Sequence, residues 1–390
     1  MTQRTGGQSP LKTSIAVAFL LLLLFGVTIA LSSQLQSPNR DFIEYWSSAK
    51  LLAQHANPYD PAAIMRIEKS QGFGFDQPLV MGNPPTSLIL FAPLGYLPYG
   101  LAASLWEMLL LLAVLGSIRL LQPFALGRIP MVAFFLAAVI DCVLAGQSAI
   151  LVLLGVSLFI RLQKDHPFWA GLALTLGILK PHLLSLFWLV LLFEIVRHRR
   201  FQIVAGGIVG FLGCCLSSII LNPHIWSDYR HDLPVSNLLL MQRPNVGTAL
   251  RMWVWPHGLW LQFVPLAIGV PLGLWFWWRT RDHWEWHREG AMIIAGAVLA
   301  SPYSFHVDQV LFVPAVLFCY PRTTRTMQGL YFVLNALALG LILKFSMLTS
   351  MATVWTAPVW VAWFATVYRQ QELGRGASRE TAPELAVSQA

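Results

Sequence analysis

Charged residues are scarce in this sequence. Asp, Glu, Lys and Arg make up 11% of its 390 residues, whereas apolar residues make up 56%. A soluble domain carries about 25% charged residues, so a chain this apolar could not cover its own surface in water. Such a composition also excludes a disordered, collagen-like or disulfide-stapled chain. With a mean hydropathy of +0.61, it predicts an all-α polytopic membrane protein.

Cysteine and nucleotide-binding motifs are also scarce or missing. The four cysteines (Cys142, Cys214, Cys215 and Cys319) lie in or beside apolar segments without CxxC or metal-site spacing. We therefore predict no disulfide and no metal site. There is no P-loop, GxGxxG, HExxH or GxSxG motif, so nothing supports nucleotide chemistry. Basic residues occur in small clusters, which argues against a nucleic-acid partner despite the net charge of +8.

Long uncharged runs recur between short basic breaks. They predict about twelve membrane helices in a single domain over residues 1–371, followed by a disordered cytoplasmic tail over 372–390. The first run, 14–31, could instead be a cleaved signal peptide. Several runs are near 14 residues, shorter than a span requires, and the stretch 86–97 is a candidate re-entrant piece. The other spans are predicted at 99–118, 130–145, 147–160, 167–179, 182–196, 202–221, 258–278, 290–302, 307–320, 327–345 and 350–368.

The basic residues also predict an orientation. If both termini are cytoplasmic, the cytoplasmic breaks hold 17 of the 26 basic residues, as the positive-inside rule requires. Two long polar loops, 32–86 and 222–257, then lie on the outer face. Polar and ionisable residues concentrate on that face, which indicates that chemistry or binding takes place there. No internal repeat is evident, which disfavours a transporter built from inverted halves.

The first outer loop holds the leading catalytic candidate. Asp41 and Glu44 open a segment, 41–54, whose apolar residues predict an amphipathic helix lying on the outer face at the membrane interface. Asp41 is either an N-cap carboxylate or a general base held beside a membrane-bound substrate. The turn formers Asn57-Pro58-Tyr59-Asp60-Pro61 and Asn83-Pro84-Pro85 are expected to fix this loop.

Three short outer turns supply further candidates. Gln147 either caps helix ends or hydrogen-bonds a ligand hydroxyl. Lys180 and His182 either extend toward lipid headgroups or contact a phosphate. His306 and Asp308 either stabilise a break between two short spans or line a cavity, and ionisable residues at membrane depth favour the functional interpretation.

Arginines of the second outer loop form a less specific group. One of them is a plausible contact for a lipid phosphate, but the sequence does not say which. The ionisable residues of this loop are Arg230, His231, Asp232, Arg243 and Arg251.

Five segments, in this order, resemble glycosyltransferase family 87, which belongs to the GT-C superfamily and contains polyprenol-phosphate-mannose-dependent α-mannosyltransferases. Asn83 and Ala149 depart from residues common in the family, which bears on sugar and acceptor preference. The similar segments are DFIEYWSSAKLLAQHANPYDP, NPPTSLILFAPLGYLPYGLAASLW, GQSAILVLL, AGLALTLGILKPHLLSLFWLVLL and SPYSFHVDQVLFVP.

The resemblance implies a GT-C-type bundle in a bacterial plasma membrane. It also implies inverting transfer of a hexose, mannose first, from a polyprenyl-phosphate donor to a glycolipid or glycan acceptor on the outer face. The donor is then a co-substrate, and no cofactor is expected. Family members use an acidic residue of the first outer loop as base, and Asp41 stands at that position. The alternative functions are a carrier or flippase for a lipid-linked sugar and a non-catalytic membrane scaffold.

Overall fold

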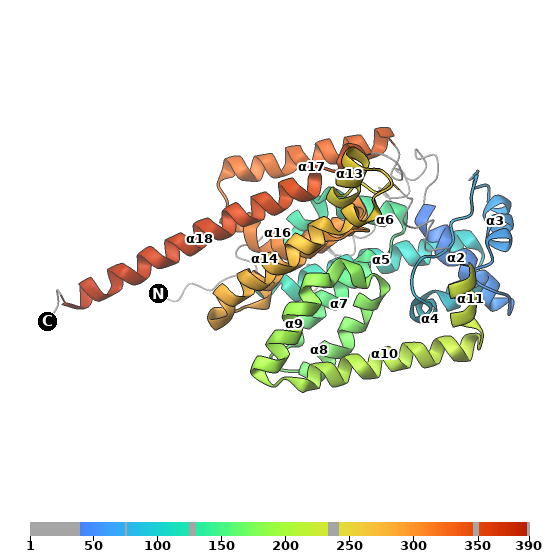
Figure 1. Ribbon diagram of the computed structural model, residues 1–390, viewed down its shortest axis with the longest axis horizontal. Helices are drawn as coiled ribbons and strands as arrows, with labels where there is room; N and C mark the ends of the chain where they lie inside the picture. The colour runs from blue at the N-terminus through green and yellow to red at the C-terminus, as the bar shows by residue number, and fades with distance from the viewer. Residues whose placement is uncertain (1–39, 75, 125–129, 233–241, 346–350, 388–390) are drawn as a thin grey trace, which may run out of the picture.

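The computed structural model describes residues 40–387 except 75, 125–129, 233–241 and 346–350. Within these residues the chain is helical throughout, with short turns and no strand (Figure 1). The first predicted span, 14–31, and its alternative as a signal peptide lie outside the described residues. The all-α class is thus confirmed for the described residues.

The helices follow the predicted apolar runs closely. Many of them begin or end in a 3₁₀ turn, notably at η5 (Leu174–Leu179), η6 (Pro181–Leu184) and η10 (His306–Phe312). The longer helices are α2 (Arg40–Ala53), α3 (Pro61–Ser70), α5 (Tyr99–Leu121), α6 (Ala137–Ala145), α7 (Ala149–Leu162), α8 (Pro167–Ala173), α9 (Ser185–His198), α10 (Phe201–Leu221), α11 (Ile225–Asp232), α13 (Val246–Val254), α14 (Val264–Thr280), α15 (Ala291–Ala300), α16 (Val313–Cys319), α17 (Arg325–Phe345) and α18 (Thr356–Val387).

Five of the described helical segments are long and apolar enough to cross a membrane, which is fewer than the twelve predicted spans. Shorter apolar helices fill the interior between them. The 14 residues of α7 reach only about 21 Å, less than the hydrocarbon core of about 30 Å, and most of its side chains are buried. The five long segments are Tyr99–Phe124, Pro181–His198, Phe201–Leu221, Leu259–His283 and Arg325–Lys344.

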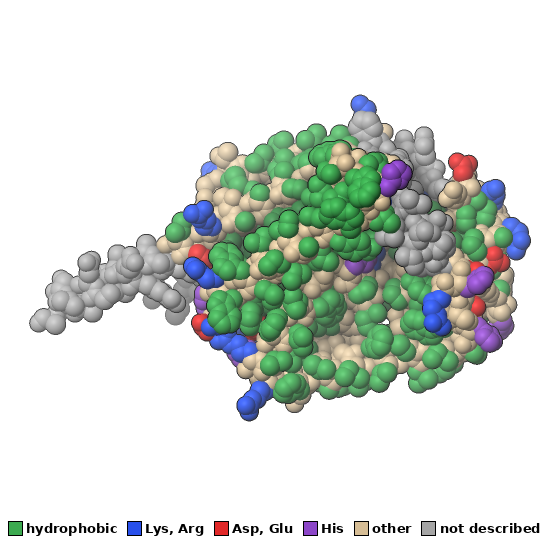
Figure 2. Space-filling model, in the orientation of Figure 1, with side chains coloured by type: hydrophobic (Ala, Val, Ile, Leu, Met, Phe, Trp, Pro, Cys, Tyr) green, Lys and Arg blue, Asp and Glu red, His purple; other side chains and the backbone are tan. Residues whose placement is uncertain are grey.

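The bundle has two polar ends separated by an apolar middle. The helices α2, α3 and α11 lie together at one end, here called the α2 end (Figure 1). The end of α9 and the start of α10 lie at the opposite, basic end. Figure 2 shows hydrophobic side chains covering most of the visible face between them, with charged side chains gathered toward both ends. This distribution is typical of an integral membrane protein.

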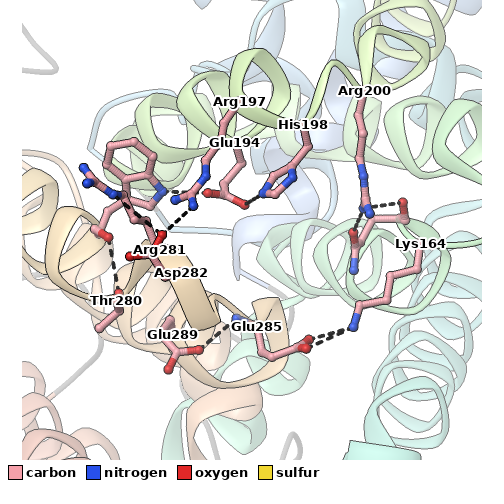
Figure 3. A network of polar contacts seen from close by, with 12 residues as sticks. Lys164, Glu194, Arg197, His198, Arg200, Thr280, Arg281, Asp282, Glu285 and Glu289 are labelled. Carbon is pink, nitrogen blue, oxygen red and sulfur yellow. Dashed lines mark hydrogen bonds and ion pairs between the residues drawn. The ribbon is translucent and has the colours of Figure 1, made fainter.

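Ion pairs join neighbouring helices at the basic end (Figure 3). Nη2 of Arg197, at the end of α9, lies 2.6 Å from Oδ1 of Asp282, just beyond α14. Nζ of Lys164, just beyond α7, lies 2.9 Å from Oε2 of Glu285. Lys164 and Asp282 are largely exposed and Glu285 is partly exposed, so each pair contributes at most about 1 kcal/mol. These contacts tie together the basic breaks that the sequence assigns to the cytoplasmic face.

The predicted amphipathic helix is present as α2, but it does not lie on a surface. Its apolar residues Phe42 and Tyr45 are fully buried, and so are its polar residues Ser47 and Ser48. Gly95 allows its segment to pack closely against α2, because a Cβ at position 95 would lie 2.1 Å from the Ala49 carbonyl oxygen. The expectation of an exposed polar face is therefore wrong, since other segments cover α2 on more than one side.

The C-terminal segment also differs from expectation. We expected residues 372–390 to be a disordered tail, but α18 continues to Val387. Residues 372–387 are thus part of one long helix, and the last three residues lie beyond the described chain.

Candidate functional site

Asp41 lies in the first turn of α2 and forms an ion pair. Nε of Arg40 donates a hydrogen bond to its Oδ1 at 2.9 Å, and both residues are largely buried, with exposed fractions of 8% and 7%. No hydrogen bond from a backbone N–H to this carboxylate occurs among the described residues, so the N-cap alternative has no support there. A buried ionic pair of this kind holds the carboxylate in one position.

Glu44 lies one turn further along α2. Burial raises the pKa of its carboxyl well above the usual range, and the neighbouring Asp41 adds to the shift, while Lys180 and Arg40 oppose it. Glu44 therefore keeps its proton where an exposed Glu would have lost it. A carboxylic acid that keeps its proton can donate a hydrogen bond to a substrate oxygen.

The Gly146-Gln147-Ser148 turn is held against α2. The Tyr45 hydroxyl donates a hydrogen bond to Oε1 of Gln147 at 2.9 Å. Gly146 ends α6 in the left-handed region, with φ of +73°, and a Cβ there would lie 2.7 Å from Cβ of Phe42. Glycine is thus required both by the backbone conformation and by the close approach of α2. Gln147 thus contacts the helix that carries Asp41.

Lys180 forms an ion pair with Asp308. Its Nζ lies 2.7 Å from Oδ1 of Asp308, while Oδ2 of the same carboxylate accepts the Phe305 backbone N–H at 2.8 Å. Both side chains are buried, so Lys180 does not extend toward lipid headgroups. The pair joins two turns 128 positions apart in the sequence, and Lys180 also acts electrostatically on Asp41 and Glu44.

His306 is paired with a residue that the sequence analysis did not identify. Its Nδ1 lies 2.8 Å from Oδ2 of Asp141 on α6, and both side chains are buried. Asp141 stands alone as a charged residue in the apolar segment 130–145. A lone carboxylate within a predicted membrane helix was the signal that could have found it.

The basic residues of the second outer loop are separated by the structure. Arg243 is 5% exposed, and its guanidinium lies 5.3 Å from the ring centroid of Tyr303. His182 packs edge-on against the same ring at 5.9 Å, and Arg243 interacts electrostatically with Asp308. The structure thus brings Arg243 to the turn that carries His306 and Asp308, whereas Arg230 is exposed on α11.

An apolar groove of about 690 Å³ lies between α14, α15 and α18. Gly269 and Gly273 of α14 and Gly296 of α15 contribute to its lining, where the absence of side chains leaves room. Val246 and Ala300 line the same groove, and their neighbours in the sequence are Asn245 and Ser301. The amide of Asn245, which caps α13, donates to the Ser304 carbonyl at 2.9 Å. The groove therefore adjoins the turn before His306.

Comparison with known proteins identifies the family. A model of glycosyltransferase family 87 matches residues 82–302, more than half of the chain. The chain belongs to glycosyltransferase family 87. No curated protein and no solved structure matches it.

Membership of family 87 makes this chain a membrane glycosyltransferase. The matched range contains Gln147, Lys180 and His182 and ends at Pro302, just before His306 and Asp308. Asp41 lies on the N-terminal side of the matched range. The support for a role of Asp41 therefore comes from its position in the structure and from the sequence resemblance, not from the family match.

One group of side chains at the basic end has the composition of a metal site. Ligand atoms of His283, Glu289 and Glu372 lie within 4.8 Å of one another. However, Arg288 forms ion pairs with both glutamates, and the Tyr368 hydroxyl donates to Glu289 at 2.9 Å. A guanidinium thus already compensates the acids, and these contacts fit a structural network better than a cation site.

Proposed function

We propose that this family 87 protein transfers a hexose, mannose first, from a polyprenyl-phosphate donor to a hydroxyl of a lipid-linked or glycan acceptor. The reaction takes place at the α2 end, which faces the outer side of a bacterial plasma membrane, with both termini in the cytoplasm and about twelve spans in all. The observation that carries the proposal is the convergence of Asp41, Glu44, Lys180 and Asp308 at that end, linked by the contacts and electrostatic interactions described above.

Asp41 acts as the general base. Its carboxylate takes the proton of the acceptor hydroxyl, and the acceptor oxygen attacks the anomeric carbon as the bond from that carbon to the phosphate oxygen breaks. The configuration inverts, and polyprenyl phosphate leaves. Arg40, 2.9 Å from Asp41, holds the carboxylate in place, and Glu44 and Gln147 hydrogen-bond the sugar or the acceptor.

Cationic and hydrogen-bonding groups around Asp308 bind the donor phosphate. Lys180, His182 and His306 are the first candidates, and the buried Arg243 joins them because it interacts electrostatically with Asp308. Because Asp308 pairs with Lys180, it lowers the net positive charge of this group and fixes the lysine in one position. Charge arranged in advance around a departing anion stabilises the transition state more than flexible surface charge does.

The apolar groove supports a lipid-linked donor. It extends from Val264 to Phe276 along α14, about 18 Å at the rise of an α-helix, which is long enough for several isoprene units. One wall of the groove ends at Ala300, just before the turn whose Tyr303 ring packs against Arg243 and His182. A nucleotide sugar has no chain to fill it.

A direct assay tests the proposal. The purified protein in liposomes is given labelled mannose on polyprenyl phosphate or on a nucleoside diphosphate, with a glycolipid acceptor. We expect product only from the polyprenyl donor, with inverted anomeric configuration. A flippase would instead move the labelled lipid between leaflets without forming product, and a scaffold would do neither, so either result would contradict the proposal.

A further inference from the structure

Asp141 is a buried carboxylate without a role in the reaction as described so far. It lies on α6, whose sequence AAVIDCVLA is otherwise uncharged, and it is 1% exposed. Burying a carboxylate costs several kcal/mol unless it is paired. Its partner is Nδ1 of His306, 2.8 Å from Oδ2 and 165 positions away in the sequence.

The contact does more than pack α6 against η10. An uncharged amide at position 141 would accept the same hydrogen bond with a smaller desolvation cost. The other carboxylate oxygen, Oδ1, has no hydrogen-bond partner among the described residues. Asp141 also interacts electrostatically with Arg40, the residue paired with Asp41. The charge of Asp141 therefore acts on two residues of the candidate site.

Asp141 determines which nitrogen of His306 is available to a ligand. With Nδ1 donating to the carboxylate, Nε2 has no hydrogen-bond partner in the described part of the chain. Nε2 can donate to a phosphate only if both nitrogens carry a proton, as in the imidazolium. A carboxylate placed at Nδ1 orients the imidazole ring and favours its cationic form, as it does for a catalytic histidine.

We propose that Asp141 is a positioning residue that holds Nδ1–H of His306 and directs Nε2–H at the phosphate of the donor. This inference rests on the proposed function, in which the donor is a phosphodiester. That phosphate carries one negative charge in the bound donor and gains a second as polyprenyl phosphate leaves. The hydrogen bond from Nε2 is thus stronger in the transition state than in the ground state, so it acts on kcat rather than on KM.

The test compares kcat and donor KM for the wild type, Asp141→Asn, His306→Gln and the double variant, with mannosyl polyprenyl phosphate as donor in liposomes. We expect Asp141→Asn to lower kcat by about 10–100-fold with donor KM nearly unchanged. In the His306→Gln background, Asp141→Asn should cause no further loss, because its effect passes through His306. Asp141→Glu, which keeps the charge, should recover part of kcat.

Asn335→Ala is the matched structural control. Oδ1 of Asn335 accepts the backbone N–H of Ala137 at the start of α6, at 2.7 Å. This variant should lower the melting temperature without changing kcat, because it loosens α6 without altering the charge at His306.

Two results would overturn the inference. One is a loss of kcat from Asp141→Asn that is equally large in the His306→Gln background. The other is an Asp141→Asn variant with lowered melting temperature and normal kcat. If Asp141→Asn does not fold, His306→Gln and the double variant still decide, since equal rates support the inference and a lower rate in the double variant contradicts it. A wild type that transfers no sugar from the polyprenyl donor would instead contradict the proposed function.

Discussion

The Nζ of Lys180 and the Oδ1 of Asp308 lie 2.7 Å apart in the interior of the α2 end. The sequence suggested each residue separately as a contact for a substrate. In the structure, the two side chains form an ion pair with each other. This pair connects the turn after η5 to η10 and so sets the distance between the candidate phosphate-binding residues.

Breaking this pair should destabilise the protein strongly. Lys180→Met leaves Asp308 buried without its cation, which costs about 3–5 kcal/mol. The double variant Lys180→Met, Asp308→Asn should recover much of that stability but not the activity. Thermal unfolding in detergent measures the effect. Lys164→Met is the control, since its pair with Glu285 is exposed and should contribute at most about 1 kcal/mol. Equal losses of stability in Lys180→Met and Lys164→Met would contradict the conclusion that the buried pair of Lys180 and Asp308 contributes more than an exposed pair.

Asp41→Asn should abolish most turnover. Removal of a general base lowers the rate by about 10²–10⁴-fold, while expression and donor binding should persist because the side chain keeps its size. Asp60→Asn is the matched control, because Asp60 caps α3 by accepting the N–H groups of Ala62 and Ala63 and Asn caps equally well. Labelled-sugar transfer measures both. Near-normal turnover in Asp41→Asn would refute its role as base and make Glu44 the next candidate.

Gly146→Ala should damage the site through the backbone. The new Cβ would lie 2.7 Å from Cβ of Phe42, so α2 must shift, and the left-handed φ of +73° adds strain of about 1 kcal/mol. Gly72→Ala is the control, because Gly72 also has positive φ but has no atom within 4 Å of such a Cβ. We expect both variants to lose stability and only Gly146→Ala to lose most of kcat. A fully active Gly146→Ala variant would show that the position of α2 does not matter.

Filling the groove should weaken the binding of long-chain donors selectively. Gly273→Leu adds a side chain beside Ile293 and Leu186. Displacing about two buried methylene groups of the donor costs about 1.6 kcal/mol, so its KM should rise by about tenfold. A donor with only two or three isoprene units should be affected little. Gly340→Leu on α17, where a Cβ meets nothing within 4 Å, is the control. Equal effects on short and long donors would place the chain elsewhere.

Glu68 predicts a pH dependence of stability. The side chain is buried on α3 and accepts the Leu79 N–H at 3.1 Å, and burial raises its pKa from 4.5 to about 7. Between these pH values the folded state holds a proton that the unfolded state has released, so stability falls as pH rises from 4.5 to 7.

Melting temperatures measured across that pH range test this dependence. In Glu68→Gln, the melting temperature should fall less steeply with rising pH than in the wild type. Asp76→Asn, at an exposed position in the same loop, should show the same dependence on pH as the wild type. An unchanged slope in Glu68→Gln would contradict the assignment.

The positions of the helices were predictable because the signal for them is local. A run such as 202–221 is apolar and uncharged, and α10 occupies residues 201–221. Turn chemistry is local as well, since Asp60 and Pro61 start α3 through contacts within a few residues. The number of spans was less predictable, because α7 is short enough to lie inside the bundle and an apolar run does not reveal whether lipid or protein surrounds it.

The sequence by itself determined the membrane class, the family and most of the ionisable residues of the candidate site, because composition and motif order do not depend on packing. Only the tertiary structure decided how those residues are paired. Lys180 meets Asp308, and His306 meets Asp141, across 128 and 165 positions. Such partners are chosen by how distant helices pack, and the burial that makes each pair necessary arises only when those helices come together.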